Sequence, residues 1–210
     1  MTLIAINILF EPDPATMERA KAINSRLLAN YPEGFPFDRH HTPHITILQR
    51  FVPRDAVEAV GRVVREVVAA APTPNWESVA TGYEVLVHGD VGVIGIVIQP
   101  TEDWLRLQTG IIEAVAPFAA ERGTAEAFAS RLDGGPISQL TVNYVNTFVG
   151  PCTGANYNPH ITLGLGTREF LEALKSEPFE PFPVRAQTVS LYQVGDYGVA
   201  QTKLHDLHPC

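Results

Sequence analysis

The chain has 210 residues, of which 45% are hydrophobic and 18% are charged, and its formal net charge is −8. This composition is typical of a globular protein with enough apolar material for one sizeable core. The negative charge argues against an extended nucleic-acid surface, because phosphates are neutralised by clustered Lys and Arg. The only cysteines, Cys152 and Cys210, form neither a disulfide framework nor a metal-ligand spacing.

The N-terminal segment, MTLIAINILFEPDP, is a short apolar run followed by acidic residues. It lacks the basic residues that begin a signal peptide, so we expect a first strand there. No stretch approaches the roughly 18 apolar residues of a membrane-spanning helix. We therefore expect a cytoplasmic monomer that binds no membrane.

The first half of the chain predicts alternating strands and helices. An apolar, β-branched run predicts a buried strand at Leu3–Phe10. A helix should follow, because Asp13 can cap its first turn and apolar residues recur on one face as far as Leu27. The next elements are a strand within 44–51 and a helix within 53–72. Two strands folded back at Gly89-Asp90 follow within 76–100.

The order of elements then starts again. VGVIGIVIQPTED has the same pattern as LIAINILFEPD, an apolar strand, a proline and an acidic helix start. A helix with its buried stripe at 104–115, a strand at 158–166, a helix at 167–177 and a strand at 182–194 follow. The segment 123–150 has weak periodicity and predicts an insertion or a long loop.

The chain therefore looks like two copies of one unit, about 1–89 and 90–210, in a single two-lobed domain over 1–210. We predict an α+β fold with a pseudo-two-fold axis. Each lobe would be an antiparallel sheet covered outside by its helices, with a central cleft between the lobes. A doubly wound parallel sheet is the competing fold. It is disfavoured because no Gly-rich phosphate loop follows a strand and the two Gly-Asp turns indicate antiparallel hairpins.

The tetrapeptide Pro-His-Ile-Thr occurs in both halves, in TPHITIL and NPHITLG. Side chains on a strand alternate between its two faces, so His44 and Thr46 share one face, and His160 and Thr162 share another. A two-fold axis would make these faces confront each other across the cleft. Two imidazoles and two hydroxyls would then converge on one small volume.

This set of groups suits the opening of a cyclic phosphodiester. A histidine pair can supply both a base for water and an acid for the leaving oxygen near neutral pH. Threonine hydroxyls can hold the non-bridging phosphate oxygens, and neither a metal nor a cofactor is required. Arg50 and Lys203 are candidates to contact a phosphate, and Tyr192 and Tyr144 are candidates to stack on a base.

The motifs HITI and HITL resemble the paired signature of the two-histidine phosphoesterase superfamily. The C-terminal VSLYQVGDYGVAQTKL resembles the tail of its bacterial branch, the RNA 2′,3′-cyclic phosphodiesterases, also called 2′-5′ RNA ligases. The resemblance implies a two-lobed fold with both motifs on central strands of the cleft. It also implies metal-independent catalysis on a cyclic phosphodiester at an RNA terminus or on a small nucleotide.

Four functions remain open at this stage. The leading one is an enzyme that opens cyclic phosphodiesters, and the second is an RNA-end ligase or processing enzyme with the same histidines. The third is a module that only binds nucleotides. The fourth is a metal-dependent hydrolase built on His40, His41 and His44, although the first two lie in a Pro/Gly-rich loop without carboxylates at ligand spacing. We expect His88, His205 and His208 to have no special role.

Overall fold

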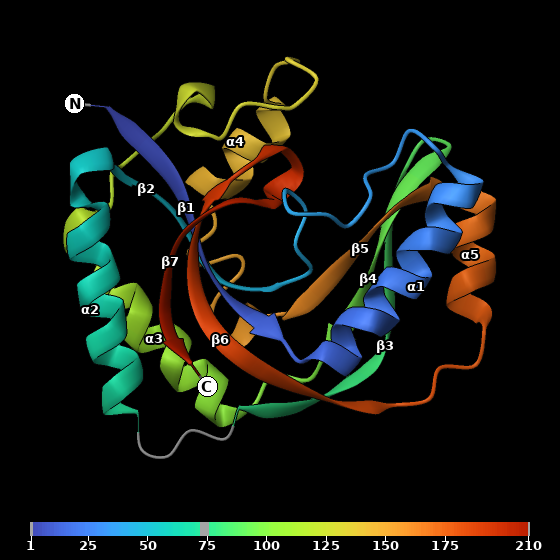
Figure 1. The fold of residues 1–210 in the computed structure, drawn as a ribbon, viewed down its shortest axis with the longest axis horizontal. Coiled ribbons are helices and arrows are strands. Elements are labelled where there is room, and N and C mark those ends of the chain that lie inside the picture. The colour runs from blue at the N-terminus through green and yellow to red at the C-terminus, as the bar shows by residue number, and fades with distance from the viewer. Residues whose placement is uncertain (1, 72–75, 210) are drawn as a thin grey trace.

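The computed structural model describes residues 2–71 and 76–209, which form both strands and helices (Figure 1). The strands are β1 (Leu3–Pro12), β2 (Ile45–Pro53), β3 (Glu77–His88), β4 (Val91–Ile98), β5 (His160–Thr167), β6 (Phe182–Val194) and β7 (Ala200–Pro209). The helices are α1 (Pro14–Asn30), α2 (Val57–Ala70), α3 (Glu102–Val115), α4 (Gln139–Asn146) and α5 (Arg168–Ser176). Cys210 lies outside the described residues.

All strand pairs are antiparallel, in the order β2-β1-β6-β3-β4-β5 with β7 on β6. Strand β6 belongs to both halves of this sheet. Its first residues, 182–185, pair with β3, and the remainder pairs with β1 on one edge and β7 on the other. We call β2, β1, β7 and the end of β6 the first lobe, and β3, β4, β5 and the start of β6 the second lobe. The antiparallel pairing confirms the predicted α+β class over the doubly wound alternative.

The helices do not stay with the strands of their own sequence half. Helix α2 packs on β7, and α3 packs on α2 and β2, whereas α1 packs on β5 and α5 on β3 and β4 (Figure 1). Helices α1 and α3 have therefore crossed to the opposite lobe. At the end of β1, Pro12 pairs with Ala186, next to the residues of β6 that pair with β3. A helix that begins at Pro14 thus starts beside the second lobe.

Helix starts follow local capping rules. The Asp13 carboxylate accepts from the Thr16 amide at 3.0 Å, which confirms the predicted cap of α1. The Thr101 hydroxyl caps α3 in the same way, at 3.2 Å from the Trp104 amide. None of the helices within 2–71 and 76–209 has both the length and the apolar character that crossing a membrane requires.

The segment 123–150, for which an insertion or a long loop is predicted, contains a helix, so the long-loop alternative is wrong. Helix α4 begins after Ser138, whose hydroxyl accepts from the Thr141 amide at 3.2 Å. An eight-residue helix is too short for a clear apolar period, so its stability comes from tertiary packing. It is part of a small apolar cluster on the first lobe, formed by Ala5, Phe51, Ala127, Phe128, Val142, Val145 and Val194.

A buried carboxylate fastens this segment to the turn between β6 and β7. Asp196, which is 6% exposed, accepts from the Ser138 amide at 3.0 Å and from the Thr141 hydroxyl at 2.8 Å. The Arg131 guanidinium donates to its other oxygen at 2.5 Å. These bonds hold the pKa of Asp196 below its usual value against the opposing effect of burial. The segment 123–150 is therefore anchored by charge-assisted bonds as well as by apolar contact.

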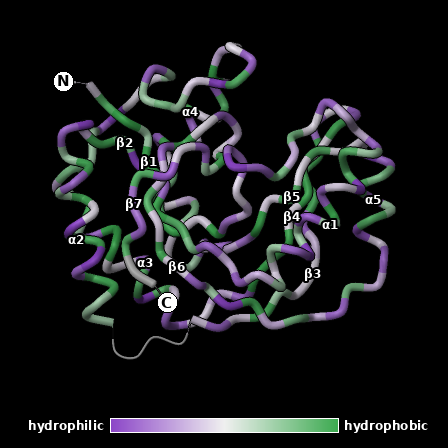
Figure 2. The backbone as a smooth tube through the Cα atoms, in the orientation of Figure 1, coloured by the Kyte–Doolittle hydropathy of each residue, from purple (hydrophilic) through white to green (hydrophobic). Residues whose placement is uncertain are grey.

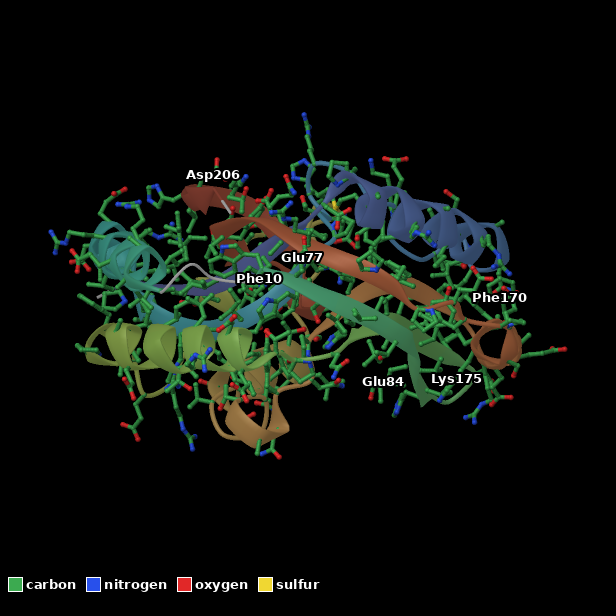
Figure 3. The ribbon with its side chains drawn as sticks, turned by 90° about the horizontal axis from the view of Figure 1, so that it is seen from below. Phe10, Glu77, Glu84, Phe170, Lys175 and Asp206 are labelled. Atoms are coloured by element: carbon green, nitrogen blue, oxygen red, sulfur yellow. The ribbon has the colours of Figure 1, made fainter. Side chains whose placement is uncertain are left out.

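The main core lies between the sheet and the helices and is continuous through both lobes. Apolar stretches of the chain coincide with the strands (Figure 2). Phe10 packs against Trp76 and Trp104, with ring centroids 5.4 and 4.7 Å apart, near the middle of the molecule (Figure 3). Along β1 the alternate residues from Ile4 to Phe10 face this core, so Asn7 and Leu9 face the opposite side, where the site lies.

Candidate active site

The two histidines of the repeated motif lie at the starts of two strands. His44 directly precedes β2 in the first lobe, and His160 is the first residue of β5 in the second lobe. Thr46 and His160 line one cavity, and a proton on His160 disfavours a proton on His44. The structure thus brings the two motifs to one place between the lobes. Thr162 shares a face with His160, because the pairing of both residues with β4 is regular.

Each imidazole is held in the same way by the backbone two residues before it. His44 Nδ1 lies 2.8 Å from the Thr42 carbonyl oxygen, and His160 Nδ1 lies 2.8 Å from the Asn158 carbonyl oxygen. A carbonyl oxygen can only accept, so Nδ1 carries the hydrogen in both rings. In its neutral form each ring therefore presents the lone pair of Nε2, which is the atom available for proton transfer.

A buried asparagine on β1 contacts both His44 and Thr46. The Asn7 amide nitrogen lies 3.2 Å from Nε2 of His44 and 3.4 Å from the Thr46 hydroxyl. The pKa of His44 is lowered from 6.5 to about 4 by burial and, to a smaller extent, by His160, against the opposing effects of the Thr42 carbonyl and Glu11. His44 is therefore neutral at physiological pH and suited to accept a proton.

The neutral state of His44 should make folding stability depend on pH. The unfolded chain binds this proton near pH 6.5 and the folded chain near pH 4, so protonation favours unfolding between these values. The contribution of neutral His44 to the free energy of unfolding is fully present above pH 6.5. About 2–3 kcal/mol of that free energy is lost as the pH falls through this window. Urea unfolding at pH 7.5 and 4.5 should show a larger loss for the natural protein than for His44→Gln. The same loss in both proteins would contradict this prediction.

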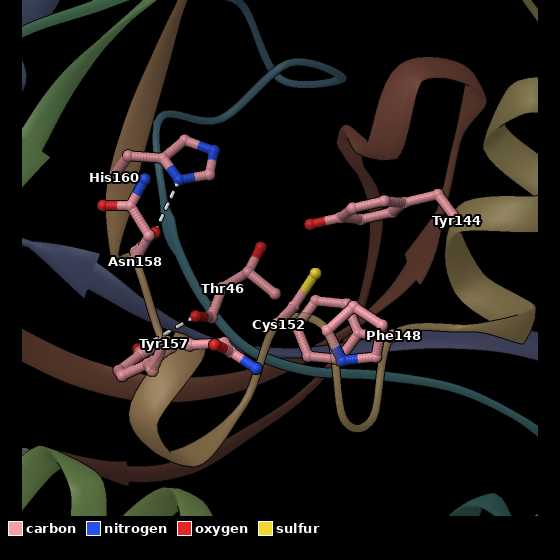
Figure 4. Close-up of a pocket in the computed structure, with 9 residues that line it drawn as sticks. Thr46, Tyr144, Phe148, Cys152, Tyr157, Asn158 and His160 are labelled. Atoms are coloured by element: carbon pink, nitrogen blue, oxygen red, sulfur yellow. Dashed lines mark hydrogen bonds between the residues drawn. The ribbon is translucent and has the colours of Figure 1, made fainter.

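A cavity of about 160 Å³ lies beside His160 and Thr46 (Figure 4). The Tyr157 hydroxyl donates to the Thr46 carbonyl oxygen at 3.0 Å and so ties β2 to the segment that leads into β5. This contact fixes Thr46 relative to His160 across the two lobes. The cavity is lined by Thr46, Tyr144, Phe148, Pro151, Cys152, Asn156, Tyr157, Asn158 and His160.

Helix α4 supplies an aromatic wall to this cavity. Tyr144 is 40% exposed, its ring packs edge-to-face on Phe148 at 5.6 Å, and its hydroxyl points towards the cavity (Figure 4). Burial raises the pKa of Tyr144, and the Cys152 thiol raises it further. Of the two tyrosines considered as base-stacking residues, Tyr144 is the one that reaches the cavity.

Tyr192 and Lys203 lie on the same side of the sheet as His44, but both already have partners. Tyr192 is 4% exposed and donates its hydroxyl to Glu11 at 3.0 Å, which leaves little of its ring for a base. The Lys203 ammonium lies 2.8 Å from Glu11 and 2.5 Å from Asp206. Burial alone would lower the pKa of Lys203, but these carboxylates raise it above its usual value. Its charge is thus largely neutralised.

Arg50 lies on the face of the sheet that is turned away from the cavity. Strands β1 and β2 shift register between Ile8 and Leu9, so Leu9 pairs with Thr46 but Ile6 pairs with Arg50. The extra residue in β2 places Arg50 on the core side, with Ile6, and its pKa is lowered by burial. The structure does not bring this side chain to the histidine pair.

The loop histidines are engaged away from the cavity. His40 accepts from Arg39 at 2.8 Å, and His41 lies 3.3 Å from Asp38 with its ring stacked on Phe35. Within the described residues, His, Cys, Asp and Glu form no group of three or more that could hold a metal ion. His205 contacts Glu58 at 3.0 Å on the outer side of the first lobe.

Asn7 was not identified from the sequence, although one feature pointed to it. It is the only polar residue in the apolar run LIAINILF, and it is fully buried. A lone buried polar residue in a strand needs a partner. That partner is 37 positions away in the sequence, so only the pairing of β1 with β2 reveals it.

The chain resembles two solved structures distantly and matches one family model. The chain is similar to Kluyveromyces marxianus Usb1 with uridine monophosphate, at 11% identity and a TM-score of 0.44, over 95% of this chain and 96% of that chain. It is also similar to another structure of Kluyveromyces marxianus Usb1, at 9% identity and a TM-score of 0.42, over 96% and 95%. No match is found among curated proteins. The family model described as the 2′-5′ RNA ligase superfamily matches residues 12–197, which include both histidine motifs. The chain therefore belongs to the 2′-5′ RNA ligase superfamily.

Proposed function

We propose that this protein opens 2′,3′-cyclic phosphodiesters of nucleotides or short RNA ends, with His44 and His160 as its acid–base pair. The observation that carries the proposal is the matched setting of the two imidazoles. Each donates its Nδ1 hydrogen to a backbone carbonyl, so Nε2 is the proton-transfer atom of both rings, once water displaces the Asn7 N–H from Nε2 of His44. Membership of the superfamily supports phosphodiester chemistry on RNA as the general class of reaction.

The reaction needs one proton acceptor and one proton donor. A neutral imidazole takes a proton from water while the water oxygen forms a bond to phosphorus. The bond from phosphorus to one ribose oxygen breaks, and the second histidine, as imidazolium, protonates that oxygen. Water is consumed, a phosphomonoester forms, and exchange with solvent restores both rings. The Thr46 and Thr162 hydroxyls would donate to the non-bridging oxygens as their charge increases.

The cavity and the charge distribution support a small substrate. A volume of about 160 Å³ is below the roughly 300–1,000 Å³ of ordinary small-molecule pockets, so a terminal phosphate and its ribose would fill it. The net charge is −8, and Lys203 is already paired with two carboxylates. Phosphates further along an RNA would find few basic partners. We expect affinity to depend weakly on RNA length and on salt.

Tyr144 is our candidate for the group that receives the base of such a substrate. Its exposed ring borders the cavity that Thr46 and His160 line, and base–aromatic stacking is tolerant of base identity. The contact would come from the inserted helix α4. Binding of the base would therefore depend on a segment outside the two repeated units.

Ligation of RNA through a 2′-5′ bond is the alternative that the same residues can serve. In that reaction a 5′-hydroxyl replaces water as the attacking group, and the acid and base are unchanged. A ligase needs to hold two RNA ends, whereas the cavity described here is sized for one. For this reason we place hydrolysis first.

The purified protein should hydrolyse 2′,3′-cyclic mononucleotides to monoesters in the presence of EDTA. A 20-mer ending in a cyclic phosphate should be hydrolysed with a kcat/KM within about tenfold of the mononucleotide, since a basic track is missing from the described surface of the cavity. Chromatography of the products over a series of NaCl concentrations measures kcat/KM for the mononucleotide and for the 20-mer. Activity that is abolished by EDTA and restored by Zn²⁺ or Mn²⁺ would contradict the mechanism. Joined RNA as the main product would favour the ligase.

A further inference from the structure

The two histidines differ at Nε2, although their Nδ1 atoms are held alike. The Asn7 amide nitrogen faces Nε2 of His44 at 3.2 Å, and Asn7 is fully buried. Because Nε2 of neutral His44 bears the lone pair, the facing group must be a donor, which is the amide N–H. The Asn7 side-chain oxygen is buried without a hydrogen-bond partner in the described structure. The side chain is thus committed to His44 and Thr46.

In the second lobe, the described residues offer no such donor to Nε2 of His160. The capping residues Asp13 and Thr101 are equivalent in the two halves, and counting back from them aligns Asn7 with Gly95. A Cβ added at Gly95 would lie 3.6 Å from Cδ2 of His160. The position is therefore next to the second imidazole but carries no side chain to contact it.

The pairing of the strands leads to the same conclusion by a different alignment. Gly95 pairs with Thr162 as Leu9 pairs with Thr46, and on this count the equivalent of the asparagine is Val93. Valine has no polar group either. Whether the equivalent of Asn7 is Gly95 or Val93, the second lobe has no amide side chain at that position. The pseudo-symmetry is broken at the group that faces Nε2.

This difference matters because a hydrogen bond to a lone pair favours the unprotonated ring. Protonation of His44 would place an Nε2–H against the Asn7 N–H, with two donors face to face, so the imidazolium is disfavoured. In the described residues His160 makes a single hydrogen bond, from Nδ1 to Asn158, and its Nε2 can carry a proton without this conflict.

We propose that Asn7 is a positioning residue that holds His44 unprotonated until the attacking water displaces the Asn7 N–H from Nε2, so that His44 is the proton acceptor of the pair and His160 the proton donor. This assignment rests on the proposed function. By donating to the Thr46 oxygen at 3.4 Å, Asn7 also turns the Thr46 hydroxyl hydrogen away from itself, towards the place of the phosphate. A single buried amide thus orients both groups of the first motif.

Other charged and titratable groups near His44 do not reverse this bias. Glu11 on β1 favours the imidazolium, but it is paired with Lys203 on β7 at 2.8 Å. The hydroxyl of Tyr192 on β6 binds the same carboxylate at 3.0 Å. His160 on β5 disfavours a proton on His44. Of these groups, only the paired Glu11 opposes the effect of Asn7.

Asn7→Asp tests the proposal, because it keeps the shape of the side chain but replaces the N–H donor by a charged acceptor. Gln49→Glu is the matched control. Gln49 pairs with Asn7 on the neighbouring strand and is 1% exposed, but its amide faces the Gly198 carbonyl at 3.5 Å. ¹⁵N-detected imidazole titrations of the full chain report the tautomer and proton affinity of each histidine without requiring turnover.

We expect Asn7→Asp to strengthen proton binding by His44 at least tenfold more than Gln49→Glu does. The acid limb of the kcat profile should move to higher pH by the same amount, with little change in KM. Equal shifts in both variants, or a shift confined to His160, would overturn the proposal.

A measurement on the natural protein keeps the proposal testable if Asn7→Asp does not fold. The Asn7 side-chain amide resonances should titrate together with His44, and resonances that follow only His160 would contradict the proposal. These spectra also distinguish the role of Asn7 from the proposed reaction. Failure to hydrolyse cyclic phosphodiesters would remove the proposed reaction, whereas coupling of Asn7 to His44 would still be observed.

Discussion

His44→Ala and His160→Ala should each reduce kcat for a cyclic nucleotide by about 10²–10⁴-fold, the usual contribution of a general acid or base. Each ring is the sole side chain of its motif that can transfer a proton, so the remaining histidine cannot replace it. Both positions are only partly buried, and the variants should stay folded by circular dichroism. His88→Ala, which removes an exposed histidine from the end of β3, is the control and should keep full activity.

The two losses should be far from additive, because acid and base act in one step. Thr46→Ala should cost less than either histidine, since it removes one hydrogen bond to the phosphate and leaves proton transfer intact. An active His160→Ala protein would refute the two-histidine mechanism.

Asp196→Ala should destabilise the protein by about 2–4 kcal/mol and impair substrate binding. The substitution removes the buried acceptor of the Arg131 guanidinium, the Ser138 amide and the Thr141 hydroxyl, and it leaves these donors unsatisfied. Asp133→Ala is the matched control, because Asp133 binds the same Arg131 from the solvent side. An exposed ion pair contributes at most about 1 kcal/mol.

Urea unfolding measures this difference between the two aspartates. Because α4 carries Tyr144, loosening its anchor should raise KM for a cyclic nucleotide more than it lowers kcat. If Asp196→Ala is no less stable than Asp133→Ala, the insertion is not held by this carboxylate. If KM is unchanged in a less stable variant, Tyr144 does not contact the substrate.

Several parts of this structure follow from local rules that operate within a few residues. The β-branched run at Leu3–Phe10 and the cap at Asp13 act through backbone sterics and a hydrogen bond to the next turn, so they can be read from the sequence. The same holds for the His-x-Thr motifs, because alternation along a strand places both side chains on one face. These features were sufficient to predict the α+β class and the candidate pair His44 and His160.

Features that depend on pairing between distant segments could not be predicted in this way. A one-residue register shift in β2 turned Arg50 to the face opposite Thr46, and no local pattern in HITILQRF marks it. Lys203 was a candidate for phosphate binding, but its charge is met by Glu11 from the other end of the chain. Neither contact exists until β1, β2 and β7 are assembled.

The sequence by itself determined which chemical groups this protein can use, since the repeated His-x-Thr motif and the apolar periodicity are local properties of the chain. The tertiary structure alone decided how those groups differ from one another. Asn7 reaches His44 across 37 residues, whereas His160 has a single hydrogen bond within the described residues, from Nδ1 to the Asn158 carbonyl. Helix α4 brings Tyr144 to the cavity through packing that its eight residues do not encode. The physical reason is that hydrogen-bond partners and burial, which set proton affinity, are properties of neighbours in space rather than in sequence.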